Sequence, residues 1–243
     1  MQNGTNESSG VALLLVDIQH DFISGSLAVP DAERILPVVK NLIESYPFDM
    51  IIASQDFHPK EHISFASSHP DGPGTFKEHK VPHPAKTGEK VDQMMWPDHC
   101  IQGTKGAEFH PIVEDAINAK RKQGIPVHII QKGTDKHVDG YSAFADNQYL
   151  GFTQLSKILH SHKCKNKAGG PIETIVVVGL ATDYCVLSSA IDARKFHFRT
   201  IIVGDAVRGV AKETTESAIK EMQGWGIEYV QTTEDLHALL VPK

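Results

Sequence analysis

Short apolar runs alternate with amphipathic stretches along most of the 243-residue chain. Uninterrupted apolar runs rich in β-branched residues are typical of strands that are buried on both faces, as in parallel sheets. The stretches between them carry apolar residues at helical spacing and predict amphipathic helices. The predicted strands are residues 11–16, 50–53, 126–131, 175–178, 200–203 and 227–230. The predicted helices are residues 32–46, 112–122, 153–160, 214–223 and a last helix that ends near residue 240.

This alternation of strands and helices predicts the class of fold. In such chains the strands form a mainly parallel sheet, and the helices pack on both of its faces. We therefore expect a three-layer α/β architecture with about six strands. The polar residues 1–10 predict a flexible tail, and residues 11–243 predict a single domain. Thr232 and Asp235 have the spacing of a capping box in front of the last helix.

The segment between residues 55 and 106 departs from this pattern. It shows little periodicity and is dense in His, Pro, Gly and Lys, so we expect a long loop. Loops of this length inside a compact domain are rare and usually functional. The segment is not a linker, because it carries apolar anchors along its length. These anchors are Phe57, Phe65, Phe76, Trp96 and Ile101.

Three chemically reactive residues follow three of the predicted strands. Asp17 comes directly after the first strand, Lys132 ends another, and Cys185 begins a helix after the turn that closes the strand at 175–178. Active sites of open α/β sheets lie beyond the carboxyl ends of the strands, so we expect these side chains to meet. A helix N-terminus lowers a thiol pKa, which favours the Cys185 thiolate. Each residue also has an ordinary role open to it, as a helix cap, a solvated cation or a core thiol.

A second group of candidate functional side chains lies in the segment between residues 55 and 106. Asp56 and His58 are two residues apart just past a strand, and an extended backbone there points both side chains the same way. His99 is a candidate third ligand, and one carboxylate with two imidazoles is typical of catalytic zinc, with iron and manganese as alternatives. Ordinary loop histidines remain the other interpretation. Competing side chains in the same segment are His62, Ser64, His69, His79 and His83.

Composition narrows the class of protein. The net charge of −6 gives no basic footprint for nucleic acid or for an anionic membrane. Three unpatterned cysteines, Cys100, Cys164 and Cys185, argue against a disulfide framework and fit a reducing compartment. The N-terminus lacks the pattern of a signal peptide, and no apolar run has the length of a membrane span. We expect a cytoplasmic protein, with the nucleus and other intracellular compartments left open.

Five ordered motifs between Val11 and Gly209 resemble those of a known family. They are VDIQHDF, ASQDFHPKEHISF, MWPDHCIQGTKGAEF, KGTDKHVDGYSAF and VVGLATDYCV. Together they resemble the nicotinamidases (pyrazinamidases) of the isochorismatase-like cysteine hydrolase family. DFHP with WPDHC resembles the metal-containing amidases of that family rather than its metal-free members. The resemblance covers most of the chain and implies the isochorismatase-like fold.

The resemblance implies a role for each matching position. Asp17, Lys132 and Cys185 match the catalytic triad. Asp56, His58 and His99 match the ligands of one divalent metal, zinc before iron or manganese, with His62 or Ser64 as an undecided fourth contact. Leu180 and Ala181 match a cis peptide, and the N–H groups of Ala181 and Cys185 match an oxyanion hole. Phe22, Trp96 and Tyr141 match aromatic residues that flank a pyridine ring.

The activity that the resemblance implies is amide hydrolysis in NAD salvage. Nicotinamide would be converted to nicotinate and ammonia through a thioester, with pyrazinamide-like analogues and a homo-oligomer left open. One alternative is a related amide or carbamoyl hydrolase of the same fold. Another is a non-enzymatic binding protein, in which the bound ion only holds the long loop in place. The polar segment 160–170 has no role that we can argue, and Cys100 is interpreted as structural.

Overall fold

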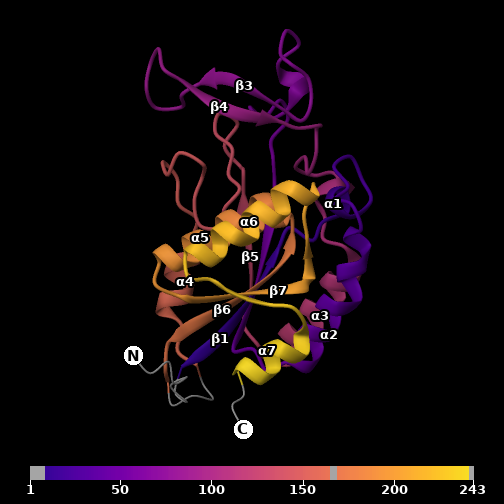
Figure 1. Cartoon of the computed structure of the whole chain (residues 1–243), viewed down its shortest axis with the longest axis vertical. Coiled ribbons are helices and arrows are strands. Elements are labelled where there is room, and N and C mark those ends of the chain that lie inside the picture. Colours follow the sequence, from indigo (N-terminus) through magenta and orange to yellow (C-terminus); the bar gives the residue numbers. More distant parts are fainter. Residues whose placement is uncertain (1–8, 165–168, 241–243) are drawn as a thin grey trace.

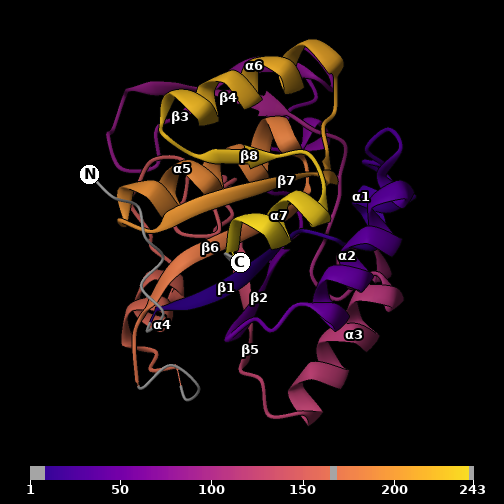
Figure 2. The same ribbon diagram turned by 60° about the horizontal axis from the view of Figure 1, so that its bottom comes forward.

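The centre of the protein is a six-stranded parallel sheet (Figures 1 and 2). The computed structural model describes residues 9–164 and 169–240. The strands follow the order β5-β2-β1-β6-β7-β8, and every pair is parallel. The predicted three-layer architecture is therefore confirmed. The strands are β1 (Gly10–Val16), β2 (Met50–Asp56), β5 (Val127–Lys132), β6 (Ile172–Leu180), β7 (Arg199–Arg208) and β8 (Glu228–Val230).

Helices cover both faces of this sheet. One buried cluster joins one face of the strands to α2 (Ile35–Ser45), α3 (Pro111–Lys122) and α7 (Thr233–Leu240). The other cluster joins the opposite face to α4 (Leu155–Ser161), α5 (Leu187–Lys195) and α6 (Lys212–Gly224). Because helices cover both faces of the sheet, the sequences of the central strands are unbroken apolar runs and do not alternate between apolar and polar residues. None of the helices in the described parts of the chain is both long and apolar enough to cross a bilayer.

The strand β1 shows how one apolar run serves two layers. Leu13 and Leu15 belong to the cluster under α2 and α3, whereas Ala12, Leu14 and Val16 belong to the cluster on the other face. All five side chains are buried. Successive side chains of a strand point to opposite faces, so a run that is apolar at every position fills both cores at once.

The segment between residues 55 and 106 is not the structureless loop that the sequence predicts. It contains an antiparallel hairpin of β3 (Lys77–Pro82) and β4 (Lys90–Met95), which projects beyond the sheet at the top of Figure 1. Its strands carry many charged, exposed residues, because the hairpin has few apolar neighbours to pack on. Hydrophobic periodicity is therefore a weak signal for a strand pair of this kind.

Other boundaries differ from the prediction in smaller ways. The strand β1 begins at Gly10, inside the range predicted as a tail, and residues 1–8 lie outside the described residues. A short helix α1 (His20–Ile23) lies where a loop is predicted. The capping box before α7 is confirmed: Asp235 Oδ2 accepts from the Thr232 N–H at 3.0 Å, and the Asp235 N–H donates to Thr232 Oγ1 at 3.2 Å.

Candidate active site

The carboxyl ends of three strands bring Asp17, Lys132 and Cys185 together. Lys132 Nζ lies 2.9 Å from Asp17 Oδ2 and 3.4 Å from Cys185 Sγ. All three side chains are buried, so little water screens their charges. An acid, an ammonium and a thiol in contact form an arrangement in which a proton can pass to and from the sulfur.

Asp17 is held in place by its backbone and by one neighbour on β2. Its φ of 48° lies in the left-handed region, which bulky side chains seldom adopt. The chain turns away from the sheet at this residue, directly after Val16 pairs with Ser54. Ser54 Oγ donates a hydrogen bond of 2.7 Å to Asp17 Oδ1. The hydroxyl thus fixes one carboxylate oxygen and leaves the other to face Lys132 Nζ.

Lys132 contacts both groups of residues that the sequence predicts, the one with Asp17 and Cys185 and the one with Asp56. It pairs with Asp56 in the β2–β5 register, and its ammonium donates to Asp56 Oδ1 at 3.1 Å and to the Gly140 carbonyl at 3.1 Å. Burial lowers the pKa of Lys132, but the negative charges of Asp17 and Asp56 outweigh it and hold that pKa well above its ordinary value. The ammonium therefore stays charged inside the protein.

Cys185 lies in the turn between β6 and α5. The strand ends at the Leu180–Ala181 peptide, which is cis, and the chain then makes a π-helical turn over Thr182–Val186. Gly179 has a φ of 119°, and a Cβ there would collide with the backbone of Val16. A glycine at this position lets β6 pass close to β1 just before the turn that carries the thiol.

The expectation that a helix N-terminus lowers the pKa of Cys185 is wrong. Burial raises that pKa well above its ordinary value; the Lys132 ammonium opposes the rise, and the charge of Asp17 adds to it. Burial also raises the pKa of Asp17, although Lys132 and Ser54 counteract this. The resting site therefore favours a neutral thiol beside a carboxylate of increased basicity.

Asp56, His58 and His99 form a compact group at the same edge of the sheet. Asp56 Oδ2 lies 3.2 Å from His58 Nε2 and 3.5 Å from His99 Nε2. All three residues are buried, and one ligand atom from each lies within 4.8 Å of the others. One carboxylate oxygen and two imidazole nitrogens that converge in this way form the donor set of a catalytic divalent metal.

The far side of each imidazole shows whether the two histidines fit a metal. Gly133 O accepts from His58 Nδ1 at 2.9 Å, and Pro97 O accepts from His99 Nδ1 at 2.7 Å. A carbonyl acceptor at Nδ1 puts the ring proton there and leaves the Nε2 lone pair free for an ion. Gly133 has a φ of 61°, and a Cβ at this position would collide with the His58 ring. The residues therefore fit a divalent metal.

A second group of possible ligands shares one residue with the first. His58, His62 and Asp139 are buried and also offer ligand atoms within 4.8 Å of one another. The rings of His58 and His62 have centroids 4.1 Å apart. His62 Nδ1 makes a hydrogen bond of 2.8 Å with Ser64 Oγ. The two residues that the sequence offers as a fourth contact, His62 and Ser64, are thus hydrogen-bonded to each other.

The other histidines of the segment 55–106 have local partners. His69 Nε2 donates to the Ile63 carbonyl at 2.8 Å, and its ring lies 5.3 Å from that of His79. His83 Nδ1 accepts from the N–H groups of Ala85 and Lys86 in the hairpin loop. These three residues are outside both groups of possible metal ligands in the described chain.

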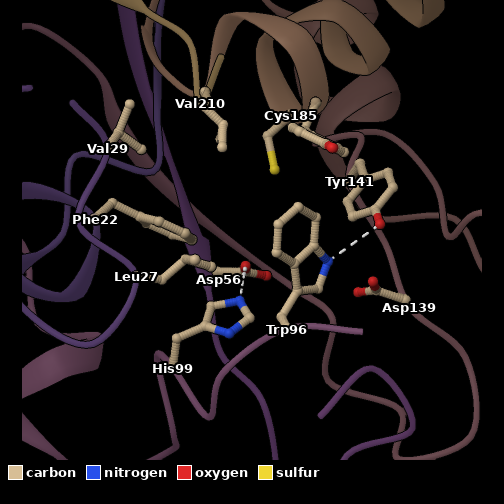
Figure 3. A pocket seen from close by; sticks show the side chains of 12 residues that line it. Phe22, Leu27, Val29, Asp56, Trp96, His99, Asp139, Tyr141, Cys185 and Val210 are labelled. Atoms are coloured by element: carbon tan, nitrogen blue, oxygen red, sulfur yellow. Dashed lines mark hydrogen bonds and ion pairs between the residues drawn. The ribbon is translucent and has the colours of Figure 1, made fainter. Parts of the chain in front are cut away.

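A pocket opens beside the thiol, Asp56 and His99 (Figure 3). Phe22, Trp96 and Tyr141 line it, and Trp96 Nε1 donates to Tyr141 Oη at 3.2 Å. Sequence reasoning missed further lining residues. Three of them lie outside the five motifs, whereas Asp139 and Tyr184 lie within a motif but were not singled out from it. These residues are Leu27, Val29, Asp139, Tyr184 and Val210.

Comparisons with known proteins show the family of the chain. The isochorismatase domain matches residues 11–235. The nicotinamidase of Escherichia coli is 37% identical over 210 residues, which cover 85% of this chain and 87% of that protein.

Two solved structures are similar in fold. The yeast nicotinamidase bound to nicotinaldehyde has a TM-score of 0.80 at 28% identity, covering 91% of this chain and 100% of that one. The pyrazinamidase of Pyrococcus horikoshii in complex with zinc has a TM-score of 0.66 at 33% identity, covering 91% of this chain and 99% of that one. The match of the domain across nearly all of the described chain shows that this protein belongs to the isochorismatase family.

Proposed function

We propose that the protein is a metal-dependent cysteine amidohydrolase that converts nicotinamide to nicotinate and ammonia in NAD salvage. The observation that carries this proposal is the contact of Lys132 Nζ with both Asp17 and Cys185, next to the group of Asp56 and two histidines. Relatives that match over most of the chain are nicotinamidases, which supports the choice of substrate. We propose a cytoplasmic location for the reaction, in keeping with the three unpatterned cysteines.

The first half of the reaction forms a thioester. Asp17 takes the proton of the Cys185 thiol, and the sulfur attacks the carboxamide carbon of the substrate. The carbonyl oxygen becomes an oxyanion, which the N–H groups of Ala181 and Cys185 stabilise. Asp17 then gives its proton to the departing nitrogen, the C–N bond breaks, and ammonia leaves. The raised pKa of Asp17 suits a group that both takes and returns a proton.

The second half consumes water. Asp17 takes a proton from a water molecule, whose oxygen attacks the thioester carbon. The C–S bond breaks, and Asp17 returns its proton to the Cys185 sulfur. The nicotinic acid that forms releases the second proton of the water to solvent and leaves as nicotinate. Lys132 stays charged throughout, since its ammonium faces two carboxylates, and it offsets the negative charge that moves between Asp17 and the sulfur as the proton is transferred.

We propose zinc as the ion that Asp56, His58 and His99 hold. Their neutral Nε2 atoms and carboxylate suit zinc, and the zinc-containing pyrazinamidase of similar fold supports this choice. A bound ion would act as a Lewis acid toward the pyridine nitrogen and so orient the ring. The protein's own side chains complete the orientation, because Phe22, Trp96 and Tyr141 line the pocket between this group and the thiol.

Ammonia release from nicotinamide tests the proposal. We expect turnover by the wild-type protein, loss of turnover after chelation, and recovery when zinc is added back. The Cys185→Ala variant should release no ammonia while its circular dichroism spectrum stays native. Ammonia release by that variant would exclude the thioester route. Turnover of other amides or carbamoyl compounds but not of nicotinamide would favour a related hydrolase, and an unreactive Cys185 with bound metal would favour a binding protein.

A further inference from the structure

Gln19 lies at the junction of β1 and β2 with all its side-chain polar atoms engaged. The residue has no exposed surface. Gln19 Nε2 donates to the Asp56 carbonyl at 2.8 Å, and Gln19 Oε1 accepts from the Asp56 N–H at 2.8 Å. The second Nε2 hydrogen goes to the Ala107 carbonyl at 2.9 Å. A buried amide satisfied on every side specifies one arrangement of the chains around it.

These contacts extend the hydrogen-bond ladder between β1 and β2 beyond the last residues whose backbones pair. The β1–β2 pairing stops at Val16 and Ser54, because Asp17 turns into the left-handed region and the chain leaves the sheet. Asp56 still belongs to β2, and its N–H and C=O on the β1 side have lost their backbone partner. The side-chain amide of Gln19 carries one donor and one acceptor in the same order as a peptide group, so it replaces that partner.

The position of the Asp56 backbone fixes its carboxylate. Asp56 Oδ1 accepts from Lys132 Nζ at 3.1 Å, while Oδ2 faces the two imidazole Nε2 atoms. A rotation of the backbone at this residue would move both oxygens at once. We propose that Gln19 is a positioning residue, which holds Asp56 in the orientation that serves the metal group and Lys132 together. The proposal rests on the proposed function only in taking that group to bind a divalent ion.

The site offers a matched control in Gln55. Gln55 Nε2 donates to the same Ala107 carbonyl at 2.7 Å, but its amide makes no hydrogen bond to the Asp56 backbone among those described. The residue is also half-buried rather than fully buried. Gln55→Glu therefore repeats the chemical change and the loss at Ala107 without the change at Asp56.

The experiment measures zinc affinity by competition with a chromophoric chelator, in the full-length protein and without substrate. Gln19→Glu puts a carboxylate oxygen against the Asp56 and Ala107 carbonyls, and Gln19→Met removes both hydrogen-bonding groups at similar volume. We expect both Gln19 variants to bind zinc about ten-fold or more weakly than the wild type, because partners that orient metal ligands have effects of this size. Gln55→Glu should stay within about three-fold.

Thermal unfolding of the metal-free variants separates positioning from a purely structural role. Gln19 variants that melt at a lower temperature but bind zinc like the wild type would overturn the proposal. An equal loss of affinity in Gln55→Glu would also overturn it, because the effect would then arise at Ala107. Failure of both Gln19 variants to fold, while Gln55→Glu folds, would assign Gln19 to folding alone. Ammonia release by the wild type, measured separately, reports on the proposed function whatever the zinc affinities show.

Discussion

At the scale of single residues, the ammonium group of Lys132 contacts the side chains of both functional groups of the site. Lys132 Nζ contacts Asp17, Asp56 and the Cys185 sulfur within a buried space. Taking such charges out of water costs several kcal/mol for each ion, and mutual attraction repays this only when every partner is present. The lysine is therefore a structural requirement of the two carboxylates as well as a part of the proposed reaction.

Replacement of Lys132 by methionine tests this dependence. Lys132→Met keeps the length of the side chain but leaves Asp17 and Asp56 buried without their cation. We expect the free energy of unfolding to fall by about 3 kcal/mol or more, together with loss of ammonia release. Urea denaturation followed by circular dichroism measures the first effect. The surface variant Lys40→Met removes an exposed pair with Glu44 and should change stability by less than about 1 kcal/mol. Equal effects in the two variants would contradict the argument.

At the scale of elements, Asp183 ties the turn that carries the thiol to the start of α6. Its carboxylate accepts from the Val210 N–H at 3.0 Å, from the Ala211 N–H at 3.3 Å and from Thr214 Oγ1. Ala211 is the N-cap residue of α6 and makes no capping hydrogen bond of its own, so Asp183 holds this residue by its N–H and the first turn of α6 by the Thr214 hydroxyl. Val210, in the same segment, lines the pocket.

The Asp183→Ala variant should lose this tie. We expect a fall of about 1 to 2 kcal/mol in the free energy of unfolding, since two backbone N–H groups lose their acceptor. We also expect a higher KM for nicotinamide, because the pocket wall at Val210 becomes less well fixed. Thr214→Ser keeps the hydroxyl partner and serves as the control for kinetics and denaturation. A variant with unchanged stability and KM would show that the tie contributes nothing to either.

A tyrosine at the end of α2 should make the free energy of unfolding depend on pH in the alkaline range. Tyr46 packs on Phe48 with ring centroids 4.5 Å apart, and burial, followed by the nearby Asp49 charge, raises the pKa of Tyr46 from 10.0 to about 12. Between these values the unfolded chain loses the phenol proton and the folded chain keeps it. The free energy of unfolding should therefore fall as the pH rises from 10 to 12, by up to roughly 1.4 kcal/mol per pH unit.

Tyr46→Phe isolates this contribution, because its ring has no ionisable group. We expect the variant to show a flatter decline of stability over that pH window than the wild type, and an unchanged slope below pH 10. Chemical denaturation at several pH values gives both curves. Parallel curves above pH 10 would mean that the phenol titrates alike in the folded and unfolded chains.

At the scale of the whole molecule, the group of Asp56, His58 and His99 connects segments that are far apart in sequence. Asp56 ends β2, whereas His99 follows the hairpin of β3 and β4. An ion bound by both would stabilise only the folded chain, since the unfolded chain does not hold the ligands together. On the proposed assignment, binding of the metal would therefore be coupled to folding.

Thermal unfolding with and without metal measures that coupling. A ligand present at 100 times its dissociation constant stabilises a protein by about 2.7 kcal/mol, so we expect chelation to lower the Tm by several degrees and zinc to restore it. His58→Ala, which removes one ligand, should show a much smaller shift. A wild-type Tm that is insensitive to chelation would contradict the assignment of the group as a metal site.

The sequence was sufficient to predict some parts of the structure and not others. The apolar runs of β1 and β6 were sufficient to predict a parallel sheet, because strands buried on both faces have no polar positions to interrupt them. The hairpin of β3 and β4 was missed, because its exposed strands lack that pattern. The lowered pKa expected for Cys185 was wrong, because a helix N-terminus is visible in sequence whereas burial among carboxylates is not.

By itself the sequence determined the order along the chain of the strands of the central sheet, the reactive residues at their ends and the motifs of the family. Local patterns suffice for these, since they depend on neighbours within a few residues. Only the tertiary structure decided that Lys132 serves two carboxylates and a thiol, and that the Gln19 amide completes the ladder beside Asp56. Those contacts join residues from separate strands, and their distances follow from the register and twist of the sheet, which no local pattern encodes.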